Sequence, residues 1–148
     1  VHALQVARVG EFPREADRSV EATLQLVRDV NFAQAYSFKY SARPGTPAAG
    51  APMQVPEEEK DRRLQALQAL LREQQAAFNQ SCVGLTIPVL FVGPGRHPGQ
   101  IAGRSPWLQP VHATGSTDLI GTEQTVAIVA AHPNSLAGRL ANQERMSA

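Results

Sequence analysis

The side chains best suited to chemistry lie after residue 95, where basic residues fall in or beside predicted loops and strand ends. This set comprises Arg96, His97, Arg104, His112 and Arg139, with Trp107 between two of them in sequence. Guanidinium groups pair with phosphates, and an exposed aromatic ring can stack on a base. The set therefore predicts a surface that faces RNA. The alternative is that Trp107 caps a hydrophobic core and that the arginines are solvated.

A second candidate is the run Tyr40-Ser41-Ala42-Arg43-Pro44-Gly45-Thr46, where a predicted strand passes into a loop. Open α/β barrels place their ligands at the carboxyl ends of their strands. Arg43, with Thr46 beside it, has the planar fork that holds a carboxylate or phosphate. The alternative is a plain turn set by Pro44 and Gly45.

Other candidates for chemistry are weaker. His97, His112 and His132 lack the helical i, i+4 spacing and the cysteine companions of metal sites, so they are interpreted as loop and strand histidines. Gly93-Pro94-Gly95 is followed by neither Gly-Lys-Ser/Thr nor a predicted helix, which indicates a hairpin turn instead of a phosphate loop. Cys82 is expected to be an inert, partly buried thiol. The sequence thus predicts no metal ligands and no catalytic residue.

The first half of the chain must position Arg43. Hydrophobic spacing predicts a helix over residues 19–29 with Ser19 as its cap, and alternation predicts a half-buried strand over residues 35–40. Prolines and glycines make residues 41–55 a loop. Pro56 then opens a long helix through residue 79, with three glutamates at its positive end.

Beyond this helix the hydrophobic period becomes two, which predicts five short strands in about 60 residues and hence a small, OB-like antiparallel barrel. The predicted strands are 86–92, 100–104, 110–113, 125–130 and 136–140. The front part, with one confident strand, is interpreted as the incomplete end of a larger α/β unit, because a lone strand has no ladder partner. The chain as a whole is therefore predicted to belong to the α+β class.

Composition limits the classes of function. The 148 residues suit one ordinary domain or two small ones, and the formal net charge of +1 gives no global field to recruit nucleic acid, so any basic site is local. One cysteine cannot form an internal disulfide or hold an iron–sulfur cluster. No apolar run approaches the roughly 20 residues that span a bilayer. We therefore expect a soluble, cytoplasmic protein without membrane contact.

Longer runs carry a family resemblance from about residue 20 to residue 140. The runs are Glu21-Ala22-Thr23-Leu24-Gln25-Leu26-Val27-Arg28, Asn31-Phe32-Ala33-Gln34-Ala35-Tyr36-Ser37-Phe38-Lys39-Tyr40-Ser41, Arg43-Pro44-Gly45-Thr46-Pro47, Gln74-Gln75-Ala76-Ala77-Phe78-Asn79, Gly103-Arg104-Ser105-Pro106 and Pro133-Asn134-Ser135-Leu136-Ala137-Gly138. In these runs the chain resembles the C-terminal part of the radical-SAM tRNA methylthiotransferases, specifically the tRNA 2-methylthio-dimethylallyladenosine synthases.

The resemblance implies an organisation. Residues 19–55 correspond to the end of the radical-SAM partial barrel, residues 56–82 to a linker helix and residues 83–141 to a TRAM barrel that binds the tRNA anticodon stem-loop. Residues 1–18 match poorly and are expected to form a disordered leader, and residues 142–148 a tail. The family methylthiolates an isopentenylated adenosine beside the anticodon with S-adenosylmethionine and two [4Fe–4S] clusters. In such an enzyme, the loop with Arg43 and Thr46 is expected to lie on the substrate and S-adenosylmethionine side of the radical-SAM barrel.

Departures from the family limit what the chain does alone. It lacks the C-x-x-x-C-x-x-C cysteines, so we expect it to bind neither cluster, to bind RNA without catalysing, and to need the missing N-terminal portion as a partner. The sibling enzymes that modify a ribosomal protein share much of this architecture, but the contexts of Arg43 and Asn134 look closer to the tRNA enzymes. The alternatives are a stand-alone RNA-binding barrel and an inactive remnant.

Overall fold

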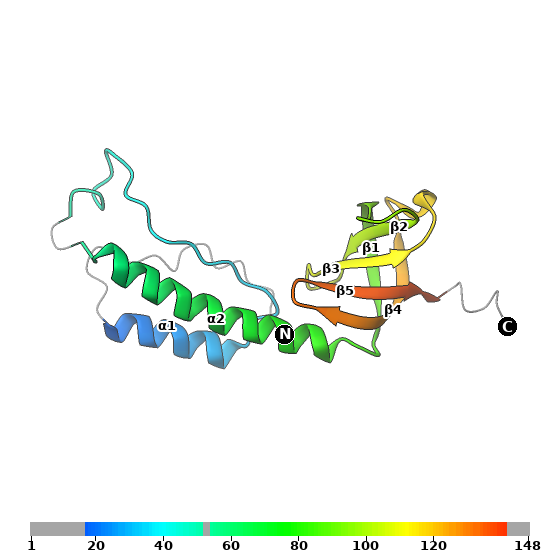
Figure 1. Cartoon of the computed structure of the whole chain (residues 1–148), viewed down its shortest axis with the longest axis horizontal. Helices are drawn as coiled ribbons and strands as arrows, with labels where there is room; N and C mark the ends of the chain where they lie inside the picture. Colours follow the sequence, from blue (N-terminus) through cyan, green and yellow to red (C-terminus); the bar gives the residue numbers. More distant parts are fainter. Residues whose placement is uncertain (1–16, 52–53, 142–148) are drawn as a thin grey trace. The chain divides into compact units, whose positions relative to one another are not determined.

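The computed structural model describes residues 17–51 and 54–141, and these divide into two compact units between Gln74 and Gln75. We call them the helical unit and the barrel unit. Helix α1 (Asp17–Val30) and most of helix α2 (Glu57–Ser81) belong to the helical unit, and the end of α2 belongs to the barrel unit (Figure 1). The leader expected at residues 1–18 and the tail at 142–148 lie almost wholly outside the described residues.

Helix α1 begins earlier than predicted and ends on a left-handed residue. Ser19 lies inside its first turn and not at its cap, so that prediction was wrong. Asn31 adopts φ 52°, and its N–H donates to the Val27 carbonyl at 3.1 Å. Asparagine tolerates this conformation, which closes the last helical turn. Val27, Phe32 and Leu67 form the small core of the unit, and the side chain of Gln74 also donates to the Val27 carbonyl, at 2.9 Å.

The strand predicted over residues 35–40 is absent. This segment has no regular secondary structure, since a strand needs a neighbour to pair with and the described part of the helical unit contains no strand. Lys39 instead pairs with Glu57 at 3.1 Å and Asp61 at 2.9 Å on α2. The alternating aromatic residues are therefore not one buried face: Phe38 is 63% exposed.

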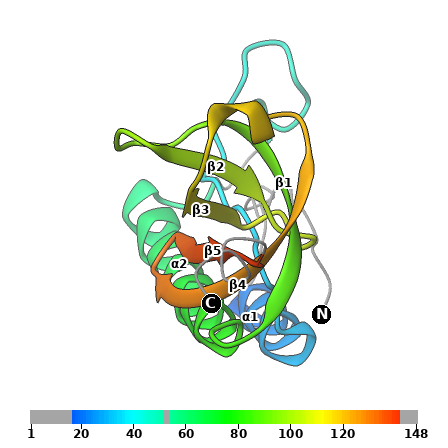
Figure 2. The ribbon, with the colours of Figure 1, turned by 90° about the vertical axis from the view of Figure 1, so that its right-hand side faces the viewer.

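The barrel unit contains the five strands that the sequence predicts, most of them slightly longer. They are β1 (Thr86–Pro94), β2 (Gln100–Arg104), β3 (Pro110–Thr114), β4 (Glu123–His132) and β5 (Ser135–Leu140), and a 3₁₀ helix η1 (Thr117–Leu119) precedes β4. The strands close in the order β1-β2-β3-β5-β4, with β4 paired to β1, and Figure 2 shows them curving around a common centre. This is the five-stranded Greek-key arrangement of OB-type barrels.

One pairing differs from the prediction. Strands β3 and β5 run parallel, with Val111 opposite Leu136, so the barrel is not wholly antiparallel. The reason is connectivity, because the chain leaves β3 through η1, pairs β4 with β1, and returns as β5 in the direction of β3. Short strands separated by turns predict antiparallel hairpins in a sequence, and this pattern gives no sign of a parallel pairing between β3 and β5.

Alternating side chains fill the barrel. Val89, Phe91, Ile101, Val126 and Leu136 are each fully buried. Two glycines allow neighbouring strands to approach each other closely, because a side chain at either position would clash. A Cβ on Gly103 would lie 2.4 Å from the Leu90 carbonyl oxygen, and a Cβ on Gly138 would lie 2.2 Å from a Val126 methyl group. No helix within the described ranges is long and apolar enough to cross a membrane.

Candidate nucleic-acid interface

A groove of about 590 Å³ lies on the barrel where the β1–β2 loop, strands β2 and β3, and the β4–β5 turn meet. OB-type barrels bind oligonucleotides and oligosaccharides on this same surface, the face of strands 2 and 3 with the loops between strands 1–2 and 4–5. The groove is lined by Gly95, Arg96, His97, Gln100, Ala102, Pro110, Val111, His112, His132, Pro133, Asn134 and Ser135.

The β1–β2 loop presents Arg96 and His97 because Gln100 fixes its backbone. The side-chain oxygen Oε1 of Gln100 accepts the N–H of Arg96 at 3.1 Å and the N–H of His97 at 3.4 Å. The N–H of Gly95 donates to the Gln100 carbonyl at 2.6 Å, and a Cβ on Gly95 would lie 2.5 Å from the Gln100 side chain. Gln100 thus fixes the backbone of the loop, and the side chains of Arg96 and His97 remain exposed.

Two histidines stack at the groove, although they are far apart in the sequence. The rings of His112, on β3, and His132, at the end of β4, have centroids 5.6 Å apart and planes inclined by 24°. Burial, and after it the nearby His132 and His97, lower the pKa of His112 from its ordinary value of 6.5. The lining residues include no carboxylate. His112 is therefore held toward its neutral form in the free protein.

A buried polar network anchors the turn that carries His132. The side-chain amide of Asn79, near the end of α2, donates to the carbonyls of His132 at 2.9 Å and Pro133 at 3.3 Å. Its Oδ1 accepts from the side chain of Gln109, which is also bonded to the Ser105 hydroxyl. Asn79, Ser105 and Gln109 are all buried, so these bonds hold the turn without competition from water.

Only part of the predicted RNA-facing set lies at this groove. Arg96, His97 and His112 line it, whereas Arg104, Trp107 and Arg139 do not. One guanidinium nitrogen of Arg104 donates to the Leu108 carbonyl at 3.1 Å. Arg139 is exposed on β5.

Trp107 packs against the barrel core. It is half-buried, and its ring makes an edge-to-face contact with Phe78 at a centroid distance of 5.4 Å. This geometry favours the core-capping alternative over an open stacking platform. A role for Trp107 in RNA contact stays a prediction.

Arg43 and Thr46 form a tight turn in the helical unit. The Arg43 carbonyl accepts the N–H of Thr46 at 3.2 Å and its hydroxyl at 2.8 Å, and Gly45 has φ 81°. Both residues are exposed. The turn leaves the Arg43 side chain accessible, but the Thr46 hydroxyl is occupied by the backbone. Their predicted place on the substrate side is not tested by this geometry.

Sequence reasoning missed two contributors to the groove and the anchor behind it. Gln100 and Asn134 line the groove, and Asn79 fixes one of its walls. None of these three residues has a local sequence signal, because the β1–β2 loop and the β4–β5 turn are brought together only by the closure of the barrel. His132 was interpreted as a loop or strand histidine, and its approach to His112 depends on the same closure.

The residues present do not fit an iron–sulfur cluster. The thiolate ligands that such clusters need would have to come from Cys82, which is 1% exposed and so more deeply buried than predicted. Burial raises the pKa of this thiol. The described ranges contain no group of three or more histidine, cysteine or acidic side chains that could hold a metal ion.

The fold and the groove define a class: a small closed β-barrel with a basic, carboxylate-free groove on the face that OB-type barrels use for binding. No family model matches the chain. The chain is 56% identical over 137 residues to the tRNA-2-methylthio-N(6)-dimethylallyladenosine synthase of Maricaulis maris. This match covers 93% of the chain, and the chain spans 30% of the length of that relative. The similarity confirms the resemblance to these tRNA methylthiotransferases that the sequence motifs indicated.

Proposed function

We propose that the chain is the C-terminal portion of a radical-SAM tRNA methylthiotransferase and that its barrel is a TRAM domain that holds tRNA. The groove between the β1–β2 loop and the β4–β5 turn carries this proposal. It combines the fixed charge of Arg96, three imidazoles and the amide of Asn134, with no carboxylate in its lining. Guanidinium and imidazole groups bind phosphates, and amides bind base edges.

The helical unit, in this proposal, is the end of the radical-SAM partial barrel. Its segment 35–40 alternates like a strand and has no strand partner in the described residues, as expected for a piece whose neighbours belong to an N-terminal portion. The methylthiolation of an isopentenylated adenosine next to the anticodon, with S-adenosylmethionine and two [4Fe–4S] clusters, belongs to that complete enzyme. The chain by itself binds RNA without catalysing.

The test is RNA binding by the whole 148-residue chain, measured by fluorescence anisotropy with a labelled anticodon stem-loop at several salt concentrations. We expect binding that weakens as salt rises, because phosphate contacts release counterions. Arg96→Glu should weaken binding about tenfold and lower the salt slope by about 1.

The matched control is Arg72→Glu, which makes the same change of charge at an exposed position of α2 in the helical unit. It should bind nearly as well as the unmodified chain. Equal losses of RNA affinity in both variants would mean that only the net charge of the chain matters, and would refute the groove as the RNA-binding site. An absence of RNA binding at low salt would refute the proposed function itself.

A further inference from the structure

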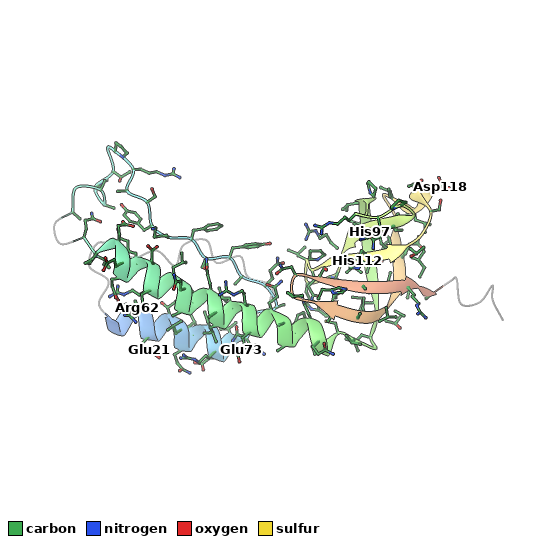
Figure 3. All side chains as sticks on the ribbon, in the orientation of Figure 1. Glu21, Arg62, Glu73, His97, His112 and Asp118 are labelled. Carbon is green, nitrogen blue, oxygen red and sulfur yellow. The ribbon has the colours of Figure 1, made fainter. Side chains whose placement is uncertain are left out.

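The groove concentrates imidazoles in a way that tRNA binding alone does not require. His97 comes from the β1–β2 loop, His112 from β3 and His132 from the end of β4, so three elements contribute one histidine each. Figure 3 labels His97 and His112, which lie near each other on the barrel. Three of the four histidines of the chain thus line one groove.

The charged groups that face these imidazoles are few. The β1–β2 loop supplies Arg96, and β2, β5 and the β4–β5 turn supply only uncharged lining residues. The end of α2 reaches the turn through Asn79, which is also uncharged. No carboxylate in the lining compensates a proton on an imidazole. A bound polyanion would supply the missing negative charge.

We propose that the groove is a proton-coupled phosphate clamp, in which the imidazoles of His97, His112 and His132 take up protons as an RNA backbone binds. The stacked pair is the centre of this device, because positive charges on two rings whose centroids lie 5.6 Å apart repel each other until a phosphate lies beside the pair. The inference rests on the proposed RNA-binding function and adds to it the dependence of affinity on pH.

The direction of the effect follows from linkage. Burial and the neighbouring histidines lower the pKa of His112 in the free protein, and a bound phosphate raises it. A group whose pKa rises on binding increases affinity fully below its free pKa, and the gain is lost as pH rises through its bound pKa. Affinity should therefore grow as pH falls through the range around 6.5, the ordinary histidine value.

The experiment titrates the whole chain with a short oligouridylate at constant salt between about pH 5.5 and 7.5, a range in which histidine titrates and uracil does not. We expect affinity to increase at least about tenfold toward the acidic end, which corresponds to the uptake of one proton over one pH unit. Replacing all three histidines by glutamine should flatten the profile. His97→Gln alone, at an exposed loop position, should flatten it in part and avoids any risk to folding.

The matched control is Arg96→Gln, which should weaken binding by a similar factor at every pH and leave the slope unchanged. Histidine ring proton shifts, followed by NMR in the unmodified chain, give a second readout: the titration midpoint of His112 should rise when oligouridylate is added. Binding that depends on Arg96 but not on pH would overturn the clamp and leave the proposed function intact. A slope that persists in the triple variant would also overturn it, and failure to bind at any pH would refute both.

Discussion

The anchoring of the β4–β5 turn by Asn79 yields a quantitative prediction for Asn79→Ala. The substitution removes two donated hydrogen bonds, to the carbonyls of His132 and Pro133, and one accepted from Gln109. Each bond contributes about 1 kcal/mol net, and a buried amide left without its partner costs about 1–3 kcal/mol. Because Asn79 and Gln109 are each 1% exposed, water cannot replace these bonds. We expect the barrel to lose about 2–4 kcal/mol of unfolding free energy.

The chain contains its own reporter for this measurement. Trp107 is the single tryptophan and packs edge-on against Phe78, the residue before Asn79. Urea unfolding followed by tryptophan fluorescence therefore reports on the barrel unit. The neighbouring Gln80 is exposed, so Gln80→Ala should stay within about 0.5 kcal/mol of the unmodified chain. If Asn79→Ala unfolds at the same urea concentration as Gln80→Ala, the network does not anchor the turn and the reasoning is refuted.

Three further predictions concern packing and titration. Gly103→Ala places a methyl group against the Leu90 carbonyl and should destabilise the barrel by about 2 kcal/mol or more in the same urea assay, whereas Gly93→Ala, with open space at its Cβ, should cost far less. Hydrogen bonds from two arginines lower the pKa of Glu59 from 4.5 to about 2, so its contribution to stability is present above pH 4.5 and lost as pH falls toward 2; acid unfolding of Glu59→Gln should lack this component. Cys82 should not react with a thiol reagent at neutral pH until urea unfolds the barrel, and rapid reaction of the native chain would contradict its burial.

The strands of the barrel could be predicted because their burial alternates. In β1, Ile87, Val89 and Phe91 point inward and their neighbours point outward. The hydrophobic residues of the sequence alternate with the same period of two. The same rule failed at residues 35–40, where alternation is present but no described strand lies alongside to complete a ladder. Alternation is a local property, whereas a strand is a relation between two segments.

The groove could be predicted only in part, for the same reason. Arg96 and His97 share one loop, and their chemistry can be read locally. The stacking of His112 on His132 depends on the parallel pairing of β3 with β5 and the turn before it, which no short-range pattern specifies. Trp107 shows the converse: its residue type suggested a stacking platform, but its contact with Phe78 packs it against the core.

The most direct test of the central claim is to map the RNA contact by NMR, titrating the whole chain with the anticodon stem-loop and following backbone and histidine signals. The account predicts that the largest changes fall on the β1–β2 loop at Arg96 and His97, on His112, and on the β4–β5 turn at His132 and Asn134. Changes centred on the opposite part of the barrel, or on the helical unit with the groove unaffected, would contradict it.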